Sequence, residues 1–327
     1  MAEVELYPLR FKPVYKDYLW GGTKIVAKYQ RAVPPGIYAE SWEVSDRLDG
    51  MSVVTNGPLA GKPLRELAQR FGPQFMGASV RTKFFPLLIK LIDASDRLSV
   101  QVHPDDGTAR RFGGEAKTEM WYVLDAKPDA HVYAGLKPGV NQAKFEEAIR
   151  TKRLEEVLNC IPVSVGDAIF VPGGRVHAID RGCLMFEVQQ NSNTTYRVYD
   201  WGRVGLDGKA RPLHIHEALR VINWNDTAPP KVPQAKVAAF GQTEVWHILS
   251  SPFFRVERVQ LADACNCAGA GATFNIFFVI TGALRLAWND TSETLAAGNT
   301  CLVPAQMPEC RMEPVDGPAA VLRVMVP

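Results

Sequence analysis

The stretch VGDAIFVPGGRVHAI, residues 165–179, decides the fold because AGNTCLVPAQMPECR, residues 297–311, repeats its pattern. Both stretches contain a glycine, then Val-Pro five and six residues later, and then a key position eleven residues after the glycine. That position is His177 in the first stretch and Glu309 in the second, an offset of 132 residues. Self-similarity of this kind predicts a duplicated structural unit.

A second match lies upstream of the first. EMWYVLDA, which begins at Glu119, aligns with NIFFVITG, which begins at Asn275, at an offset of 156 residues. The two offsets differ by 24 residues, which is about the length of a helix with its flanks expected within residues 138–161 of the first copy only. Two β-sandwich domains of the jelly-roll type explain both matches.

Most of the chain has the pattern of a many-stranded β protein. Short apolar runs such as FFPLLIKLI, MWYVL, AIFVP, CLMFEV and IFFVI are separated by glycine and proline. Helical patterns are few, and we expect helices within residues 62–72, 141–159 and 214–222. The polar, proline-containing stretch 225–236 is expected to be a linker. The sequence therefore predicts a mainly β protein with a few helices.

Composition excludes several classes of partner. The 327 residues are 46% hydrophobic, and 37 basic against 35 acidic residues leave a net charge of +2, which argues against nucleic-acid or membrane binding through bulk charge. We find no apolar export segment and no run of about 18 apolar residues that could span a membrane. A cytoplasmic location and reduced cysteines are expected.

Candidate metal ligands gather in the first copy. In LSVQVHPDD, residues 98–106, Gln101 and His103 are two residues apart and project from the same face of a strand. Taken alone, this stretch favours a strand edge with a solvated polar face. With Glu119 and His177 added, two imidazoles, a carboxylate and an amide oxygen suit zinc and would accept other divalent metals.

The second copy has Asn275 and Glu309 where the first has Glu119 and His177, and these are a poor ligand set. We therefore expect residues 1–232 to form a metal-binding catalytic domain with N-terminal strands and helical insertions. Residues 233–327 are expected to form a degenerate domain of the same kind, without metal ligands.

Charged residues near the expected metal suggest a phosphorylated sugar as the ligand. Lys117, Glu187, Arg197 and Arg203 flank the strands that would carry the ligands. Arginine binds phosphate through two parallel hydrogen bonds, lysine acts as a point charge, and a carboxylate accepts protons. The alternative is that the basic residues lie in solvent and Glu187 is structural. The competing pair His214 and His216 is expected to be structural, at the start of a helix.

The stretches LSVQVHPDD, KTEMWYVL, VPGGRVHAI and NSNTTYRVYDWGR, in this order, closely resemble type I phosphomannose isomerases. YLWGG, ESWEVSD and FPLLIKLIDA extend the resemblance over most of residues 7–220. The family consists of cupin-fold zinc enzymes that interconvert mannose 6-phosphate and fructose 6-phosphate. The spacing resembles the short bacterial and archaeal form. The resemblance implies two cupin domains, one Zn2+ per chain and a cytoplasmic isomerase of carbohydrate metabolism.

The resemblance also implies roles for single residues. Gln101, His103, Glu119 and His177 match the zinc ligands, and Arg197 and Lys117 match catalytic and substrate-binding positions. Ser99 matches a serine associated with phosphate binding, and Glu187 an acidic residue proposed for proton transfer. Isomerisation through a cis-enediolate requires a base, and Glu187, Lys117 and a metal-bound hydroxide all remain admissible.

Two other functions remain open from the sequence. One is a metal-dependent cupin oxygenase, against which the lysine and arginine residues argue. The other is a non-catalytic cupin that binds a sugar phosphate, against which the complete ligand set argues. In each case the expected partner is a small molecule, with no nucleic acid and no membrane, and the chain is expected to be a monomer or a homodimer.

Overall fold

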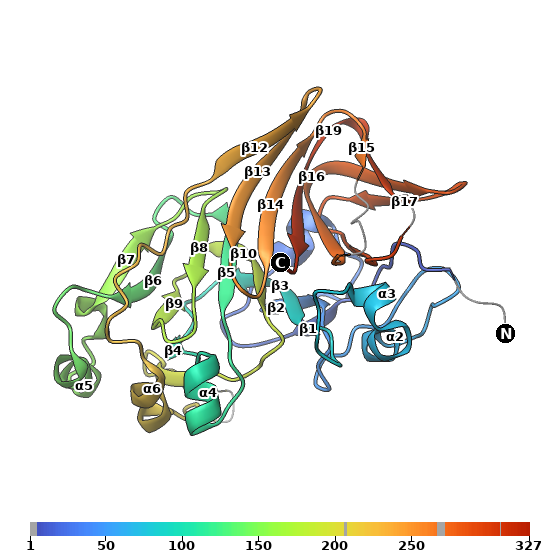
Figure 1. Cartoon of the computed structure of the whole chain (residues 1–327). Helices are drawn as coiled ribbons and strands as arrows, with labels where there is room; N and C mark the ends of the chain where they lie inside the picture. Colours follow the sequence, from blue (N-terminus) through green and yellow to red (C-terminus); the bar gives the residue numbers. More distant parts are fainter. Residues whose placement is uncertain (1–4, 206–207, 267–271, 308) are drawn as a thin grey trace. The chain divides into compact units, whose positions relative to one another are not determined.

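Figure 1 shows the computed structural model of the chain, which describes residues 5–205, 208–266, 272–307 and 309–327. The chain forms two compact units. One unit, Tyr15–Ser41 and Lys90–Val232, contains the middle of the sequence and is called the central unit for that reason. The other unit, Met1–Val14, Trp42–Ile89 and Pro233–Pro327, contains both ends of the sequence and is called the flanking unit.

Two β-sheets form the central unit. The first sheet has the strand order β1 (Val14–Lys16), β2 (Glu40–Val44), β3 (Leu87–Ala94), β10 (Cys183–Gln190), β5 (Glu119–Ala126) and β8 (Ala168–Val171). The second sheet has the order β11 (Tyr196–Tyr199), β4 (Val100–Val102), β9 (His177–Ile179), β6 (His131–Leu136) and β7 (Leu158–Pro162). Strands β1, β2 and β3 belong to the central unit through residues 15–16, 40–41 and 90–94.

Two apolar cores follow from the alternation of side chains along these strands. Trp121 of β5, Met185 of β10 and Ile179 of β9 belong to one core cluster, which lies between the two sheets. Val100 of β4 and Val198 of β11 belong to a second cluster, on the opposite face of the second sheet. Since successive residues of a strand point to opposite faces, strands β9, β6 and β7 of the second sheet contribute to both cores.

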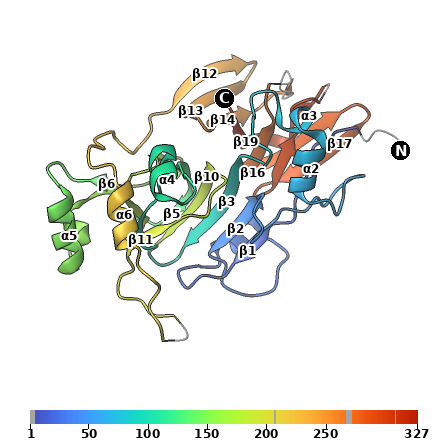
Figure 2. The same cartoon turned by 60° about the horizontal axis from the view of Figure 1, so that its bottom comes forward.

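Helices α5 (Gln142–Arg150) and α6 (Ile215–Val221) cover the outer face of the second sheet, because their buried residues belong to the second cluster. Helix α4 (Asp106–Phe112) lies beside α6, as Figures 1 and 2 show. The remaining helices are α1 (Lys24–Tyr29) in the central unit and α2 (Leu64–Phe71) and α3 (Pro73–Met76) in the flanking unit.

The three helices expected from the sequence are present, with one difference. Helix α2 begins after Pro63 and ends before Gly72, which has a φ of 48° that favours glycine. The helix expected over residues 141–159 is interrupted, because Lys152 adopts a left-handed φ of 58°. The chain then continues as a short 3-10 helix, Leu154–Glu156.

The flanking unit contains an eight-stranded sheet. Its main order is β12 (Ala235–Phe240), β13 (Thr243–Ser250), β14 (Arg255–Leu261), β19 (Arg311–Met325), β16 (Asn275–Trp288) and β17 (Thr291–Ala296). Strand β15 (Cys265–Asn266) pairs with β19, and β18 (Thr300–Val303) pairs with β16. Strand β12 begins inside the stretch expected to be a linker, at Ala235.

The strand register supports the internal repeat. Glu119 lies opposite Val171 in the β5–β8 ladder, and Asn275 lies opposite Val303 in the β16–β18 ladder. These pairs are related by the offsets of 156 and 132 residues found in the sequence. The expected mainly β fold with few helices is confirmed, whereas the division into domains at residues 232 and 233 stays a prediction.

Two smaller expectations concern membranes and cysteines. No helix in the described part of the chain is long and apolar enough to cross a membrane. Five cysteines are free thiols, namely Cys160, Cys183, Cys265, Cys301 and Cys310. Cys267 lies outside the described residues.

Candidate active site and metal centre

The second sheet of the central unit aligns three polar side chains across neighbouring strands. Arg197 of β11 lies opposite Gln101 of β4, and Gln101 lies opposite His177 of β9. Val100 and Val102 point into the core beneath the helices, so Gln101 between them points to the face between the sheets. Cross-strand neighbours share a face, and the three polar side chains therefore line one interior surface.

The first sheet supplies the opposing acidic residues. Glu119 is the first residue of β5, two residues before Trp121, which belongs to the core between the sheets. Glu187 of β10 lies opposite Trp121 and accepts a hydrogen bond of 3.0 Å from its indole Nε1. Alternation places both carboxylates on the interior face.

Three of the four expected metal ligands form a buried cluster. One candidate ligand atom from each of His103, Glu119 and His177 lies within 4.8 Å of the others. The Nε2 atoms of His103 and His177 are 3.6 and 3.3 Å from oxygens of Glu119. All three side chains are at most 1% exposed. Two imidazoles and a carboxylate in this arrangement could hold a divalent metal.

Backbone carbonyls orient both imidazoles. His103 Nδ1 donates to the carbonyl oxygen of Thr194 at 2.8 Å, and His177 Nδ1 donates to that of Arg175 at 2.8 Å. These bonds fix the tautomer in which Nε2 carries a lone pair directed at Glu119. Burial lowers the pKa of His177 to about 3 and the pKa of His103 well below its ordinary value. Both rings are therefore neutral, as metal ligation requires.

Glu119 tests whether these residues fit a metal. Its carboxylate is buried, Oε1 accepts no hydrogen bond from the described residues, and Oε2 faces the ammonium of Lys117. Burial raises the pKa of Glu119, although the ammonium of Lys117, 2.5 Å from one oxygen, acts in the opposite direction. A buried carboxylate with one oxygen that accepts no hydrogen bond, facing two neutral imidazoles, is an environment that a divalent cation would stabilise. The donor set fits a metal such as zinc.

The fourth expected ligand, Gln101, lies at the edge of this cluster. Its amide Nε2 is 3.3 Å from His177 Nε2, and its Oε1 accepts a hydrogen bond of 3.2 Å from Ser99 Oγ. Oxygen and nitrogen of an amide have the same shape, so either atom fits the position facing the imidazole. The structure thus brings Gln101 to the cluster through its register with His177.

A second buried ionic group lies beside the metal cluster and was not predicted from the sequence. Lys90 Nζ is 3.4 Å from Glu40 Oε2 and 3.3 Å from Glu187 Oε1. Burial opposes ionisation of Glu187, but the charges of Lys90 and Lys117 and the hydrogen bond from Trp121 outweigh it and lower the pKa of Glu187. Glu187 is therefore a carboxylate held ionised inside the protein.

Lys117 joins the metal cluster rather than solvent. Its ammonium is 2.5 Å from Glu119 Oε2 and 3.2 Å from His103 Nε2, and its side chain is only 6% exposed. The sequence placed Lys117 near the metal from its spacing to Glu119, and the geometry agrees with that placement.

Arg197 and Ser99 lie on the other side of Gln101. Arg197 Nε donates to Ser99 Oγ at 3.3 Å, and Ser99 Oγ in turn donates to Gln101 Oε1. Arg203, the other arginine of this segment, instead donates to Asp200 at 2.5 Å and to the carbonyl oxygen of Arg97. The expected convergence on the site therefore holds for Arg197 and not for Arg203.

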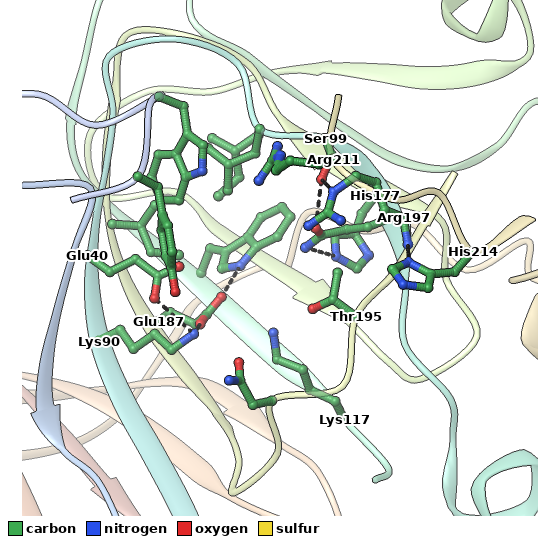
Figure 3. Close-up of a pocket in the computed structure, with 18 residues that line it drawn as sticks. Glu40, Lys90, Ser99, Lys117, His177, Glu187, Thr195, Arg197, Arg211 and His214 are labelled. Carbon is green, nitrogen blue, oxygen red and sulfur yellow. Dashed lines mark hydrogen bonds and ion pairs between the residues drawn. The ribbon is translucent and has the colours of Figure 1, made fainter. Parts of the chain in front are cut away.

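A cavity of about 370 Å³ connects these groups (Figure 3). This volume is typical of small-molecule sites. It is lined by all the catalytic and phosphate-binding candidates and also by residues that the sequence did not suggest, namely Tyr18, Trp20, Glu40, Lys90, Trp121, Thr195, Arg211 and His214. A lysine inside the apolar run FPLLIKLIDA was the signal for Lys90, because a charged side chain is rarely buried without a partner.

The alternative histidine pair is divided by the structure. His214 lines the cavity and its Nδ1 accepts a hydrogen bond from the backbone N–H of Arg197 at 3.3 Å. His216 is exposed. Neither belongs to the metal-type cluster found among the described residues.

The second copy contains a charge-reversed counterpart of this site. Phe277 of β16, at the position of Trp121, lies opposite Arg323 of β19, as Trp121 lies opposite Glu187. Arg323 lies opposite Glu257 of β14, with which it forms an ion pair of 3.7 Å, and its Nε donates to Asn275 at 2.7 Å. The second copy thus has the cation Arg323 where the first has the carboxylate Glu187, and the carboxylate Glu257 on the neighbouring strand where the first has Lys90. Asn275 is fully buried and serves as a hydrogen-bond acceptor.

Known proteins resemble this chain in sequence and fold. A family model described as the catalytic domain of type I phosphomannose isomerase matches residues 8–132. The probable mannose-6-phosphate isomerase GmuF of Bacillus subtilis (strain 168) is 37% identical over 311 residues, which are 94% of this chain and 96% of that protein. The crystal structure of mannose 6-phosphate isomerase from Bacillus subtilis has a TM-score of 0.89 at 30% identity, with 97% of this chain and 99% of that chain covered.

A more distant structure shares the fold. It is described as mannose 6-phosphate isomerase bound with zinc and yttrium, and it has a TM-score of 0.74 at 14% identity, covering 96% of this chain and 98% of that chain.

Proposed function

This chain belongs to the type I phosphomannose isomerases, and we propose that it interconverts mannose 6-phosphate and fructose 6-phosphate through a cis-enediolate. The observation that carries the proposal is the buried cluster of His103, Glu119 and His177 beside a cavity that also contains an ionised carboxylate and an arginine. The oxygenase and the non-catalytic alternative receive no support from the isomerases that this chain resembles.

Zinc is the proposed metal, which His103, Glu119, His177 and the amide oxygen of Gln101 would hold. For this the amide group of Gln101 is turned over, so that Nε2 donates to Ser99 Oγ and the Ser99 hydroxyl hydrogen is free for the phosphate. Neutral imidazoles oriented through Nδ1 and a buried carboxylate are the ligands that zinc prefers. When bound, the ion supplies Lewis-acid stabilisation of negative charge on the sugar oxygens.

Glu187 is the proposed base that moves the proton between the sugar carbons. Its carboxylate is ionised because Lys90, Lys117 and Trp121 stabilise the negative charge. Lys117 is less suitable as a base, since its ammonium group has no lone pair and is engaged by Glu119 Oε2 at 2.5 Å. Lys117 instead stabilises negative charge as it develops on the substrate.

The phosphate group is proposed to bind at Arg197 and Ser99. These two residues are joined to the metal cluster through Gln101, so an anion held there lies at a fixed separation from the reacting end of the sugar. Binding energy from the remote phosphate then holds the reacting carbons in place. Glu187 itself is only 3% exposed, so its ionised carboxylate is shielded from bulk water.

The test is a coupled assay for fructose 6-phosphate from mannose 6-phosphate. Purified protein would be measured as isolated, after removal of metal with a chelator, and after restoration with zinc, with His177→Ala as the control variant. The expected result is activity that disappears with the chelator, returns with zinc and is absent in H177A. Metal-loaded protein that forms no fructose 6-phosphate would refute the proposed reaction.

The domain organisation, the cellular location and the oligomeric state are also proposed. We propose that residues 1–232 form the catalytic cupin domain and residues 233–327 a degenerate cupin domain without metal ligands. A cytoplasmic location and a monomeric or homodimeric state accompany the proposed function. Sedimentation of the purified chain would decide between monomer and homodimer.

A further inference from the structure

Two guanidinium groups line the cavity at the end opposite the buried carboxylates. Arg197 comes from β11, and Arg211 comes from the segment that precedes α6. Figure 3 shows both side chains among those that line the cavity. Only Arg197 has been given a role in the proposed function, so the purpose of a second arginine in the same cavity requires an explanation.

Each guanidinium is held in place and retains a donor group. Arg197 donates through Nε to Ser99 and through Nη1 to the carbonyl oxygen of Pro212 at 3.0 Å. Arg211 donates through Nε and Nη2 to the two oxygens of Asp200, at 2.8 and 2.6 Å. Nη2 of Arg197 and Nη1 of Arg211 donate to no other described residue. Fixed donors of this kind suit an oxyanion.

The charges around these groups do not cancel. Asp200 is shared between Arg211 and Arg203, and Arg203 also pairs with Asp96 at 3.6 Å, so Arg197 has no ion pair of its own with either carboxylate. Burial and the charge of Arg211 both lower the pKa of Arg197, as expected for like charges in close proximity. The guanidinium groups thus outnumber the carboxylates that pair with them, and this excess of positive charge suits a phosphate anion.

His214 adds a neutral donor to the same end of the cavity. Because its Nδ1 accepts the backbone N–H of Arg197, its neutral ring carries the proton on Nε2. The end of the cavity thus offers two guanidinium groups, a hydroxyl group at Ser99 and an imidazole N–H, and the carboxylates that line the cavity in the described part of the chain, Glu40 and Glu187, lie at its opposite end.

We propose that Arg211 is a second arm of the phosphate anchor and that it determines the preference for phosphorylated over free sugars. Asp200 acts as a positioning residue, since it touches Arg211 rather than the cavity. This inference rests on the proposed function, because it assigns the phosphate of the proposed substrate to a particular pair of side chains.

The experiment compares Arg211→Met and Arg211→Lys with the wild-type zinc-loaded protein. The control is Arg220→Met, an exposed arginine in the last turn of α6 that does not line the cavity. Two quantities are measured: the KM and kcat for mannose 6-phosphate, and the dissociation constant of inorganic phosphate by calorimetric titration. Zinc content and far-UV circular dichroism establish that each variant is folded and loaded.

The expected result for R211M is a rise of about 10-fold to 100-fold in both the KM and the phosphate dissociation constant, which is the usual effect of removing a hydrogen bond to a charged group. The kcat is expected to change much less, because the anchor binds substrate and transition state equally. R211K is expected to recover part of the loss, since lysine keeps the charge but not the planar fork. R220M is expected to match the wild type.

Unchanged phosphate binding in folded R211M would overturn the inference, and so would wild-type protein that binds no phosphate. The titration also separates this inference from the proposed reaction. Protein that binds phosphate through Arg211 but forms no fructose 6-phosphate would refute the reaction and leave the anion site standing.

Discussion

Glu187 and Trp121 are direct cross-strand neighbours, and the indole Nε1 of Trp121 donates to the Glu187 carboxylate at 3.0 Å. The register of β5 and β10 therefore fixes the orientation of the proposed base. Trp121 also belongs to the core between the two sheets, so the same side chain packs the fold and aligns the carboxylate.

Trp121→Phe is expected to alter the pH dependence of activity more than substrate binding. Phenylalanine keeps an aromatic ring but lacks the N–H that stabilises the Glu187 carboxylate, so the pKa of Glu187 rises. The acid limb of the kcat/KM profile is expected to move to higher pH by about one unit. Because the pKa of Glu187 is lowered to about 2, the pH series must extend from pH 2 to pH 6 to measure this shift. An unchanged acid limb would show that Glu187 does not limit the rate.

Lys90→Met is expected to destabilise the protein as well as to inactivate it. The substitution leaves Glu40 and Glu187 buried without the ammonium that both contact. The free energy of unfolding is expected to fall by about 3–5 kcal/mol, as is usual when one partner of a buried ion pair is removed. Urea titration measures the loss. Adding Glu40→Gln should recover part of it, and failure to do so would argue that the two residues are not coupled.

Asp226→Ala is expected to weaken zinc binding without touching a ligand. Asp226 holds the guanidinium of Arg175 through hydrogen bonds of 2.5 and 2.7 Å, and the carbonyl oxygen of Arg175 orients His177. Loss of such indirect support typically costs about 10-fold to 100-fold in metal affinity. Competition with a chromophoric chelator measures the affinity, and Glu147→Ala, which breaks an exposed ion pair with Arg150, is the control.

Asp200→Asn is expected to remove stability at neutral pH but not in acid. Burial opposes ionisation of Asp200, yet hydrogen bonds from Arg211 and Arg203 lower the pKa of its carboxyl. A carboxyl with a lowered pKa in the folded state stabilises the protein above its unfolded pKa, and this stability is lost as pH falls through the folded value. The difference in the free energy of unfolding between wild type and D200N is therefore largest above about pH 5 and decreases below about pH 4.

Thermal unfolding of both proteins at several pH values tests the Asp200 prediction. Asp17→Asn, which changes an exposed aspartate, is the control. An equal difference between wild type and D200N at pH 3 and pH 7 would contradict the assignment.

The sequence predicted the repeat and the ligand cluster because both depend on local spacing. Gln101 and His103 share a strand face by alternation, and Val-Pro at a fixed distance from glycine marks equivalent positions in the two copies. The pairing of Glu119 with Val171 and of Asn275 with Val303 agrees with the offsets read from the sequence.

The sequence could not predict contacts that depend on strand order. Lys90 meets Glu187 because β3 and β10 are neighbours in the sheet, although the two residues are almost a hundred positions apart. Arg211 follows β11 in the sequence, and its ion pair with Asp200 holds its side chain beside the cavity. The left-handed turn at Lys152, which divides the expected helix, has no glycine or asparagine to signal it.

The reversed pair of Glu257 and Arg323 bears on protein engineering. The same point of the two sheets accepts a buried ion pair of either polarity, so exchanging both residues at once would preserve charge balance where a single exchange would not. To install a second catalytic centre in this chain, one would therefore exchange the charges at positions 257 and 323 before introducing metal ligands. Glu257→Lys combined with Arg323→Glu would be the first substitution, and the site in the central unit would show which ligands to add next.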